Sequence, residues 1–223
     1  MNRFFFVFIF VTEFMSCGII IRKPVLEDVS KIMNLDRFVN FEYFKPIYIN
    51  GYAHLSVGQN PDYYIEQDLK YDEERLCEAI KIDSFGDFIA VDQDNNKIIG
   101  YISAKILNSE NFKIRLLIVD KKYRGQRIGK RLINELLVSA LKCFPKLKYC
   151  IVYPYKFANE DTLKFYMSVG FENLGLPEDY LQDGLYKVKY SELYYYFRLD
   201  LSKFDIKRVF KKIDFDGICK SSK

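Results

Sequence analysis

Residues 114–132 read Ile-Arg-Leu-Leu-Ile-Val-Asp-Lys-Lys-Tyr-Arg-Gly-Gln-Arg-Ile-Gly-Lys-Arg-Leu. An apolar run is followed by a basic turn with two glycines, and then by apolar residues at helical spacing. The order predicts a strand, a tight turn and an amphipathic helix. The helix is marked by Ile128, Leu132, Ile133, Leu136, Leu137, Ala140 and Leu141.

The turn is a candidate anion-binding site. The first N–H groups of a helix have no partner inside it, and the helix dipole adds partial positive charge there. Gly125 and Gly129 allow a ligand to approach the backbone closely. Four cations add charge: Arg124, Arg127, Lys130 and Arg131. A basic surface turn is the alternative interpretation, since neither a Walker loop nor a Gly-x-Gly-x-x-Gly fingerprint is present.

The segment Arg124-Gly125-Gln126-Arg127-Ile128-Gly129 resembles the Arg/Gln-x-x-Gly-x-Gly/Ala motif of the GNAT acetyltransferases. Residues 159–171, which run from Asn159 through Phe165-Tyr166 to Gly170-Phe171, resemble the family's Asn…Phe-Tyr…Gly-Phe segment. The resemblance implies that the loop amides hold the pyrophosphate of acetyl-coenzyme A. Arg127 stands where glycine is most usual, so this position needs a backbone conformation that an arginine can adopt.

The resemblance covers residues 17–200. It implies an α/β (α+β) GNAT fold: a central mixed, mostly antiparallel sheet of six to seven strands, flanked by helices and splayed at the cofactor strand. Periodicity predicts strands at residues 18–23, 112–120, 148–153, 171–174 and 186–200, with a hairpin of 87–91 and 98–104. The expected helices are residues 26–35, 128–142 and 160–169, and residues 36–86 form a long insert.

The resemblance also assigns roles to individual residues. The backbone of Leu117, Ile118 and Val119 is expected to contact the pantetheine arm of the cofactor. Tyr166 matches the general acid that protonates the coenzyme A thiolate, although it also suits a packed aromatic position. The remaining cofactor-binding residues are expected to be Arg124, Gly125, Gln126, Arg127, Ile128, Gly129, Lys130 and Asn159, the last of which is equally a good helix N-cap.

The general base stays open. Candidates are Asp120, Glu110, His54 and an ordered water chain. Asp120 is expected to be structural, because it sits close to the phosphate turn. His54 lies in the insert that, in this family, forms the acceptor wall together with the loop at residues 175–186.

The expected function is transfer of an acetyl group from acetyl-coenzyme A to a primary amine by direct attack in a ternary complex. Protein N-termini, lysines, small amines and aminosugars all remain open as acceptors. The alternative is a non-catalytic acyl-coenzyme A-binding sensor or scaffold. The protein is expected to be a monomer or homodimer.

The composition of the chain bears on nucleic-acid binding, disulfide bonds, metal sites and cellular location. The chain of 223 residues is 49% hydrophobic with a net charge of +4, which is too small to indicate nucleic acid. Five widely spaced cysteines and one histidine favour neither disulfides nor a metal site. A reducing, cytoplasmic location is therefore expected.

The chain divides into residues 1–14, 15–200 and 201–223. The first segment contains an apolar run at residues 4–11, interrupted soon afterwards by Glu13. This segment is interpreted as a membrane-contacting leader or as a mis-set start. Residues 15–22 resemble the natural start of a GNAT domain, whose first strand opens the protein. Residues 15–200 form the acetyltransferase-like domain, and residues 201–223 form a basic tail.

Overall fold

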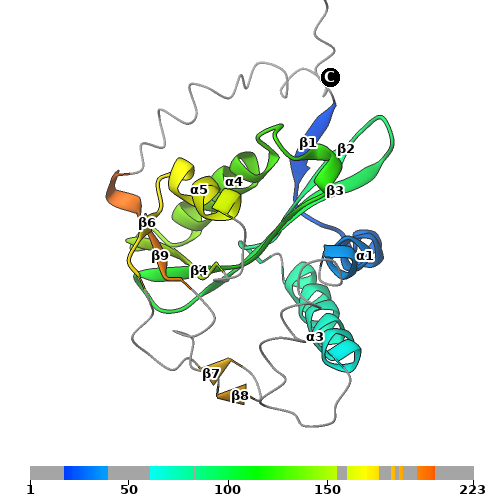
Figure 1. Ribbon diagram of the computed structural model, residues 1–223, viewed down its shortest axis with the longest axis horizontal. Helices are drawn as coiled ribbons and strands as arrows, with labels where there is room; N and C mark the ends of the chain where they lie inside the picture. Colours follow the sequence, from blue (N-terminus) through cyan, green and yellow to red (C-terminus); the bar gives the residue numbers. More distant parts are fainter. Residues whose placement is uncertain are drawn as a thin grey trace, which may run out of the picture.

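The computed structural model describes residues 18–39, 61–82, 84–154, 160–175, 182–183, 186–187 and 195–203. A mixed sheet with helices on both faces forms the body of the molecule (Figure 1). Its strands lie in the order β1-β2-β3-β4-β5-β9-β6. They are β1 (Ile19–Arg22), β2 (Phe88–Asp92), β3 (Lys97–Ile106), β4 (Asn111–Val119), β5 (Tyr149–Val152), β6 (Glu172–Asn173) and β9 (Phe197–Asp200). The predicted fold class is confirmed.

The helices cover the two faces separately (Figure 1). One face is covered by α1 (Val29–Val39), which follows the short 3-10 helix η1 (Leu26–Asp28), and by α3 (Pro61–Lys81). The other face is covered by α4 (Ile128–Cys143) and α5 (Glu160–Val169). The predicted helices at residues 26–35, 128–142 and 160–169 are therefore found, and α3 occupies the second half of the predicted insert.

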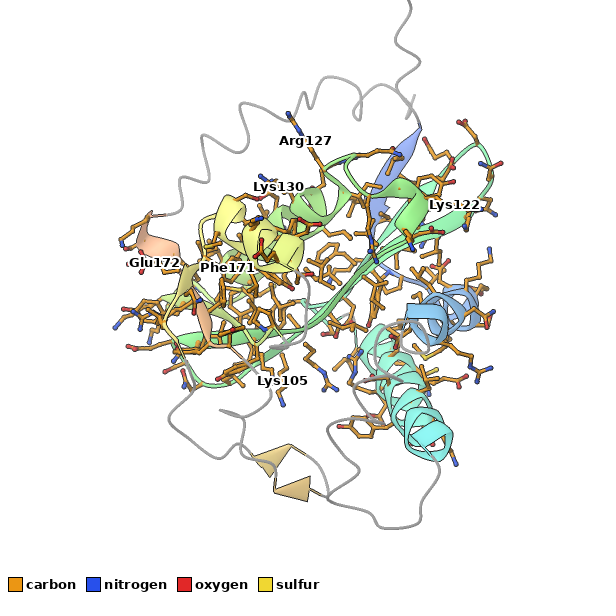
Figure 2. All side chains as sticks on the ribbon, viewed as in Figure 1. Lys105, Lys122, Arg127, Lys130, Phe171 and Glu172 are labelled. Atoms are coloured by element: carbon orange, nitrogen blue, oxygen red, sulfur yellow. The ribbon has the colours of Figure 1, made fainter. Side chains whose placement is uncertain are left out.

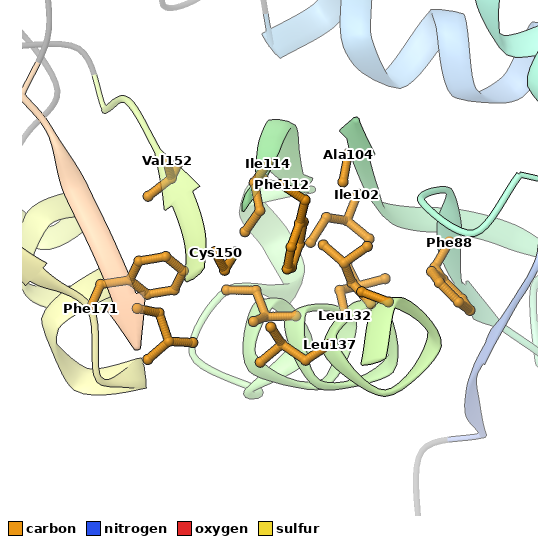
Figure 3. Close-up of a cluster of buried hydrophobic side chains, with 14 of the residues drawn as sticks. Phe88, Ile102, Ala104, Phe112, Ile114, Leu132, Leu137, Cys150, Val152 and Phe171 are labelled. Atoms are coloured by element: carbon orange, nitrogen blue, oxygen red, sulfur yellow. The ribbon is translucent and has the colours of Figure 1, made fainter. Parts of the chain in front are cut away.

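The larger core lies between the sheet and α4. Figure 3 shows Ile102 and Phe112 of the sheet pointing toward Leu132 and Leu137 of α4. The apolar positions that predicted this helix are the ones that its buried face uses, and Leu132 and Leu137 are both 0% exposed. A smaller core on the other face joins α1 and α3 to Ile89, Tyr101 and Ile118.

A β-bulge interrupts β4 at Arg115. Ser103 of β3 pairs with Leu116 while Ala104 pairs with Ile114, so Arg115 is the extra residue. An extra residue reverses the alternation of side chains beyond it. Ile114 therefore belongs to the α4 core, whereas Leu116 and Ile118 belong to the α1 and α3 core.

The sheet splays between β4 and β5. These parallel strands pair only at Asn111↔Tyr149, Phe112↔Cys150 and Lys113↔Ile151. From Ile114 to Val119, β4 pairs with β3 and has no partner on its other edge among the described residues. The predicted splay at the cofactor strand is thus present.

The predicted final strand at residues 186–200 is wrong as a single element. Tyr186–Lys187 (β8) pairs with Gln182–Asp183 (β7) in a separate two-stranded sheet, and among the described residues of this range Phe197–Asp200 alone joins the main sheet. A continuous run of tyrosines and branched residues has strand propensity throughout, so propensity does not show where one strand ends.

Candidate functional site

The basic turn folds as the motif predicts. A 3-10 helix, η3 (Lys121–Tyr123), follows β4, and α4 begins after Arg127. Arg127 has φ 62° and ψ 12°, the left-handed conformation that glycine adopts most easily. The arginine thus takes the backbone shape of the glycine that usually stands there. Figure 2 shows its side chain projecting away from the sheet at the start of α4.

The first turn of α4 is open to a ligand. Arg127 at the N-cap provides no side-chain hydrogen bond to the helix, so its first N–H groups receive no cap. Gly125 has φ +82°, and a Cβ added there would meet nothing within 4 Å. The space above the turn is therefore unfilled by the described residues, as an anion cradle requires.

The basic side chains around the cradle differ in their partners. Arg124 donates from Nε to the Val119 carbonyl at 3.2 Å, which ties the turn to the end of β4. Lys130 donates to the Ser168 carbonyl at 3.1 Å, and Arg131 to the Ile19 carbonyl at 2.8 Å. Ile128 is buried, while Gln126 and Arg127 are exposed.

Alternate residues of β4 direct their backbone N–H and C=O groups toward the splay. The Asp120 N–H donates to the Ile99 carbonyl of β3 at 2.8 Å. Backbone groups of successive strand residues point to alternate edges, so those of Ile118 also point toward β3. Leu117 and Val119 therefore direct their N–H and C=O groups toward the splay, where the Val119 carbonyl meets Arg124.

Tyr166 belongs to α5, and its side chain extends from this helix toward the sheet. It is 7% exposed and contacts the rings of Phe165, Phe171 and Phe197 at centroid distances of 5.2, 5.5 and 6.3 Å. Burial raises the pKa of Tyr166 well above its ordinary value, and the nearby Cys150 adds to this shift. A phenol is protonated at neutral pH with or without this shift, so the group can serve as a proton donor.

Close packing of α5 on α4 depends on Gly129. A Cβ added there would lie 3.0 and 3.2 Å from two ring carbons of Phe165. Gly129 therefore serves helix packing beside the cradle, because any larger residue would push Phe165 away.

The candidate bases on described residues are both engaged. Asp120 accepts from Lys97 Nζ at 2.6 Å and from the Lys122 N–H at 3.0 Å, which makes it the cap of η3. Burial alone would raise the pKa of Asp120, but these donors outweigh it and the pKa lies below its ordinary value. Glu110 accepts from Lys148 Nζ at 2.5 Å. The structural role expected for Asp120 agrees with these contacts.

Several predicted features lie outside the described residues. They are Asn159, His54, residues 1–14, most of the acceptor loop at residues 175–186, and residues 204–223 of the tail.

Sequence reasoning missed a polar network beneath α3. The Tyr101 hydroxyl donates to Asp87 at 2.6 Å and accepts from Arg75 at 2.9 Å. Asp72 accepts from Arg75 at 3.4 Å and from Arg115 at 3.2 Å. The sequence offered one signal of this network, the spacing of Asp72 and Arg75 on a helix. Their partners on β3 and β4 come from distant parts of the chain, so no sequence pattern indicated them.

None of the described helices combines the length and the apolar character that crossing a bilayer demands. Among the described residues, the His, Cys, Asp and Glu side chains form no group of three that could hold a metal ion.

A known family model matches part of the chain. Residues 85–173, from the turn before β2 to the end of β6, match the family model of the acetyltransferase (GNAT) domain. No curated protein matches the chain.

Solved structures share the fold over most of their length. PaiA N-acetyltransferase from Thermoplasma acidophilum, in complex with coenzyme A, has 23% identity and a TM-score of 0.54, covering 82% of this chain and 99% of its own. A GNAT-family acetyltransferase from Staphylococcus aureus Mu50 has 17% identity and a TM-score of 0.56, with coverages of 82% and 99%. Spermidine N-acetyltransferase from Vibrio cholerae, in complex with coenzyme A and spermine, has 18% identity, a TM-score of 0.52 and coverages of 83% and 96%.

Proposed function

We propose that this chain, a member of the GNAT acetyltransferase superfamily, transfers an acetyl group from acetyl-coenzyme A to a primary amine by direct attack in a ternary complex. The observation that carries the proposal is the splay. Beyond Lys113, the edge of β4 that faces β5 is unpaired among the described residues, α4 begins without a side-chain cap, and Tyr166 is buried in α5, which packs on α4. Coenzyme A in the T. acidophilum and V. cholerae structures makes acetyl-coenzyme A the natural co-substrate.

In this proposal the turn before α4 binds the pyrophosphate. The uncapped N–H groups of Ile128, Gly129 and Lys130 and the turn amides of Gly125, Gln126 and Arg127 supply donors. Arg124, Arg127 and Lys130 supply charge. Asn159 remains a proposed further contact, based on the motif alone.

The splayed edge of β4 would bind the pantetheine arm. Leu117 and Val119 offer N–H and C=O groups to an extended ligand in the way a neighbouring strand would. Ile118 supports this edge by its own pairing with Tyr101 of β3. Binding along the edge would place the thioester at the mouth of the splay, where a backbone N–H can stabilise the developing oxyanion.

Tyr166 would act as the general acid. Attack of a neutral amine on the thioester carbonyl forms the new C–N bond, and collapse of the intermediate breaks the C–S bond and expels a thiolate. The Tyr166 phenol, which is protonated at neutral pH, would give its proton to that thiolate. Because Asp120 and Glu110 are occupied by lysines, His54 and an ordered water chain remain as routes for the amine proton.

Calorimetric titration with acetyl-coenzyme A, at modest salt, tests the proposal. Dephospho-coenzyme A serves as the comparison ligand. Micromolar binding followed by thiol release with an amine would support catalysis. Binding with no thiol release from any amine would favour the alternative of an acyl-coenzyme A sensor or scaffold. Absence of binding would contradict both.

A further inference from the structure

Arg115, the bulged residue of β4, is held by a helix on the face of the sheet opposite α4 (Figure 1). The extra residue of a β-bulge has no opposite partner in the ladder. The Arg115 guanidinium donates to the Asp72 carboxylate of α3 at 3.2 Å and lies 5.8 Å from the ring centroid of Tyr71. The proposed cofactor strand is therefore tied to α3 at the point where its own pairing is irregular.

Asp72 is itself connected to the buried part of the sheet. Arg75, one turn further along α3, donates to Asp72 at 3.4 Å and to the Tyr101 hydroxyl at 2.9 Å. The Tyr101 hydroxyl donates in turn to Asp87 at 2.6 Å, and these two residues are 1% and 2% exposed. A chain of polar contacts thus runs from the residue before β2, beneath α3, to the bulge of β4.

The bulge determines the direction of the backbone groups that follow it. Arg115 contacts α3, and Leu116 packs against the core formed with α1 and α3, so two successive side chains lie on one face of the sheet. Regular alternation resumes beyond them, and Leu117 directs its N–H and C=O toward the splay. A change in the conformation of the bulge would therefore redirect the Leu117 N–H.

The contact between Asp72 and Arg115 is better suited to fixing a geometry than to adding stability. Their side chains are 28% and 22% exposed. Removing such charges from water costs free energy that offsets much of their attraction. A partly buried ion pair can nevertheless select one arrangement of the groups that it joins. The arrangement selected here is that of the bulge.

We propose that Asp72 is a positioning residue for acetyl transfer: it holds Arg115, and through the bulge it directs the Leu117 N–H at the thioester carbonyl. The inference deepens the proposed function and rests on it. An N–H that is already aimed at the developing oxyanion needs no reorganisation during the reaction. Loss of the Asp72 carboxylate would weaken this donor in the transition state, while the turn before α4 would still bind the pyrophosphate.

Steady-state kinetics of the full-length protein test the inference, with thiol release from acetyl-coenzyme A measured on n-butylamine and on the peptide amide Ala-Gly-Gly. Asp72→Asn should lower kcat by about fivefold or more, with little change in the dissociation constant of acetyl-coenzyme A. Arg115→Gln should have the same effect. The double variant should lose no more than either single variant, because Asp72 acts through Arg115. Asp72→Glu keeps the carboxylate and should retain most of the turnover.

Two controls separate positioning from general loss of structure. Glu74→Gln removes the same charge from an exposed site on α3 and should leave kcat unchanged. Tyr101→Phe removes a contact of the same polar network, while Arg75 keeps its contacts with Asp72 and with Asp87 at 3.5 Å. It should lower stability in urea unfolding more than it lowers kcat.

The Leu117 amide signal of ¹⁵N-labelled protein reports the bulge itself. We expect this signal to move in Asp72→Asn, in the free protein and in the coenzyme A complex, and to stay in place in Glu74→Gln. Unchanged kcat in Asp72→Asn, additive losses in the double variant, or an equal fall of kcat in Tyr101→Phe would overturn the inference. Absence of acetyl-coenzyme A binding, or of thiol release with any amine, would instead overturn the proposed function; the Leu117 signal of the free protein would still show whether Asp72 fixes the bulge.

Discussion

At the scale of single residues, Arg127 combines a backbone cost with a charge. A left-handed conformation costs a non-glycine residue about 1–2 kcal/mol. At φ 62°, Arg127 bears this cost next to the uncapped start of α4. Nearby Gly125 has φ +82° but does not bear this cost, because glycine has no Cβ. A charge retained at such a position is consistent with an anionic ligand above the turn.

Replacing Arg127 separates these two contributions. Arg127→Gly removes the left-handed cost but adds about 0.5–1 kcal/mol of chain entropy, so the free energy of unfolding should stay level or rise slightly. Arg127→Ile should lower it by about 1–2 kcal/mol, because a branched residue tolerates positive φ poorly. Urea unfolding measures both. A clear loss of stability in Arg127→Gly would mean that residue 127 does not adopt this conformation.

Two buried tyrosines should respond to loss of the hydroxyl in opposite ways. Tyr166→Phe keeps the ring contacts in α5, so we expect at least a tenfold fall in kcat with little change in acetyl-coenzyme A affinity or stability. Tyr101→Phe leaves Asp87 without its 2.6 Å donor and should cost about 1–3 kcal/mol of stability, with a much smaller effect on kcat. Steady-state kinetics and urea unfolding on both variants check this. Unchanged turnover in Tyr166→Phe would remove it from the mechanism.

The local motif predicted the strand, the turn and the helix well, because its residues are consecutive and its geometry is set by the backbone. The absent glycine marked residue 127 as a position that needs an unusual backbone conformation, and the structure shows that this conformation is left-handed. The pairing of Arg115 with Asp72 could not be read in this way, since those residues are 43 positions apart. Their contact depends on where α3 packs, which no local pattern specifies.

At the scale of elements, the contact between α4 and α5 places Tyr166 relative to the cradle. Gly129→Ala improves intrinsic helix propensity by about 1 kcal/mol but drives a Cβ against Phe165. We expect a net loss of about 1–2 kcal/mol from this overpacking. In a Phe165→Leu background the same substitution should cost much less, and a double-mutant cycle by urea unfolding measures the difference. Additive effects would mean that the two residues do not contact.

The turn between β1 and α1 should be sensitive to acid. Burial raises the pKa of Asp28, but donors from Arg22 at 2.6 Å and from the Val25 N–H at 2.8 Å outweigh it, so the pKa lies below its ordinary value. Its contribution is therefore complete above the unfolded pKa of about 3.9 and is lost as pH falls through the folded value.

Asp28→Asn tests that contribution. It should lower the free energy of unfolding by about 2 kcal/mol at pH 7, because charge-assisted hydrogen bonds are lost. The gap to the unsubstituted protein should close as pH falls from 4 to 2. Asp94→Asn, in the exposed β2-β3 turn, is the control. A gap that stays constant with pH would contradict the assignment.

Helix α3 was expected only as part of a long insert, but the other helices and the hairpin followed directly from periodicity, since each is formed by neighbouring residues. The strand expected at residues 186–200 did not, because strand ends are set by partners elsewhere. Tyr195 and Tyr196 donate to the carbonyls of Pro154 and Gly175 before β9 begins at Phe197. Local strand propensity does not predict such contacts.

At the scale of the whole molecule, the sheet consists of two parts. Strands β1 to β4 form one, and β5, β9 and β6 form the other. Three residue pairs near the start of β4 join them, with α4 packed beneath. Family resemblance implied this splay, while periodicity alone could not, because a strand's residues look the same whether one edge or two edges are paired.

The edge of β4 that has no partner among the described residues has a thermodynamic consequence for ligand binding. A ligand that occupies it ties the two parts of the sheet together in the native state and has nothing comparable to bind in the unfolded chain. Occupancy is therefore coupled to folding: at a hundred times the dissociation constant, about 2.7 kcal/mol is added to the free energy of unfolding. The melting temperature of this protein should thus report the concentration of free cofactor around it.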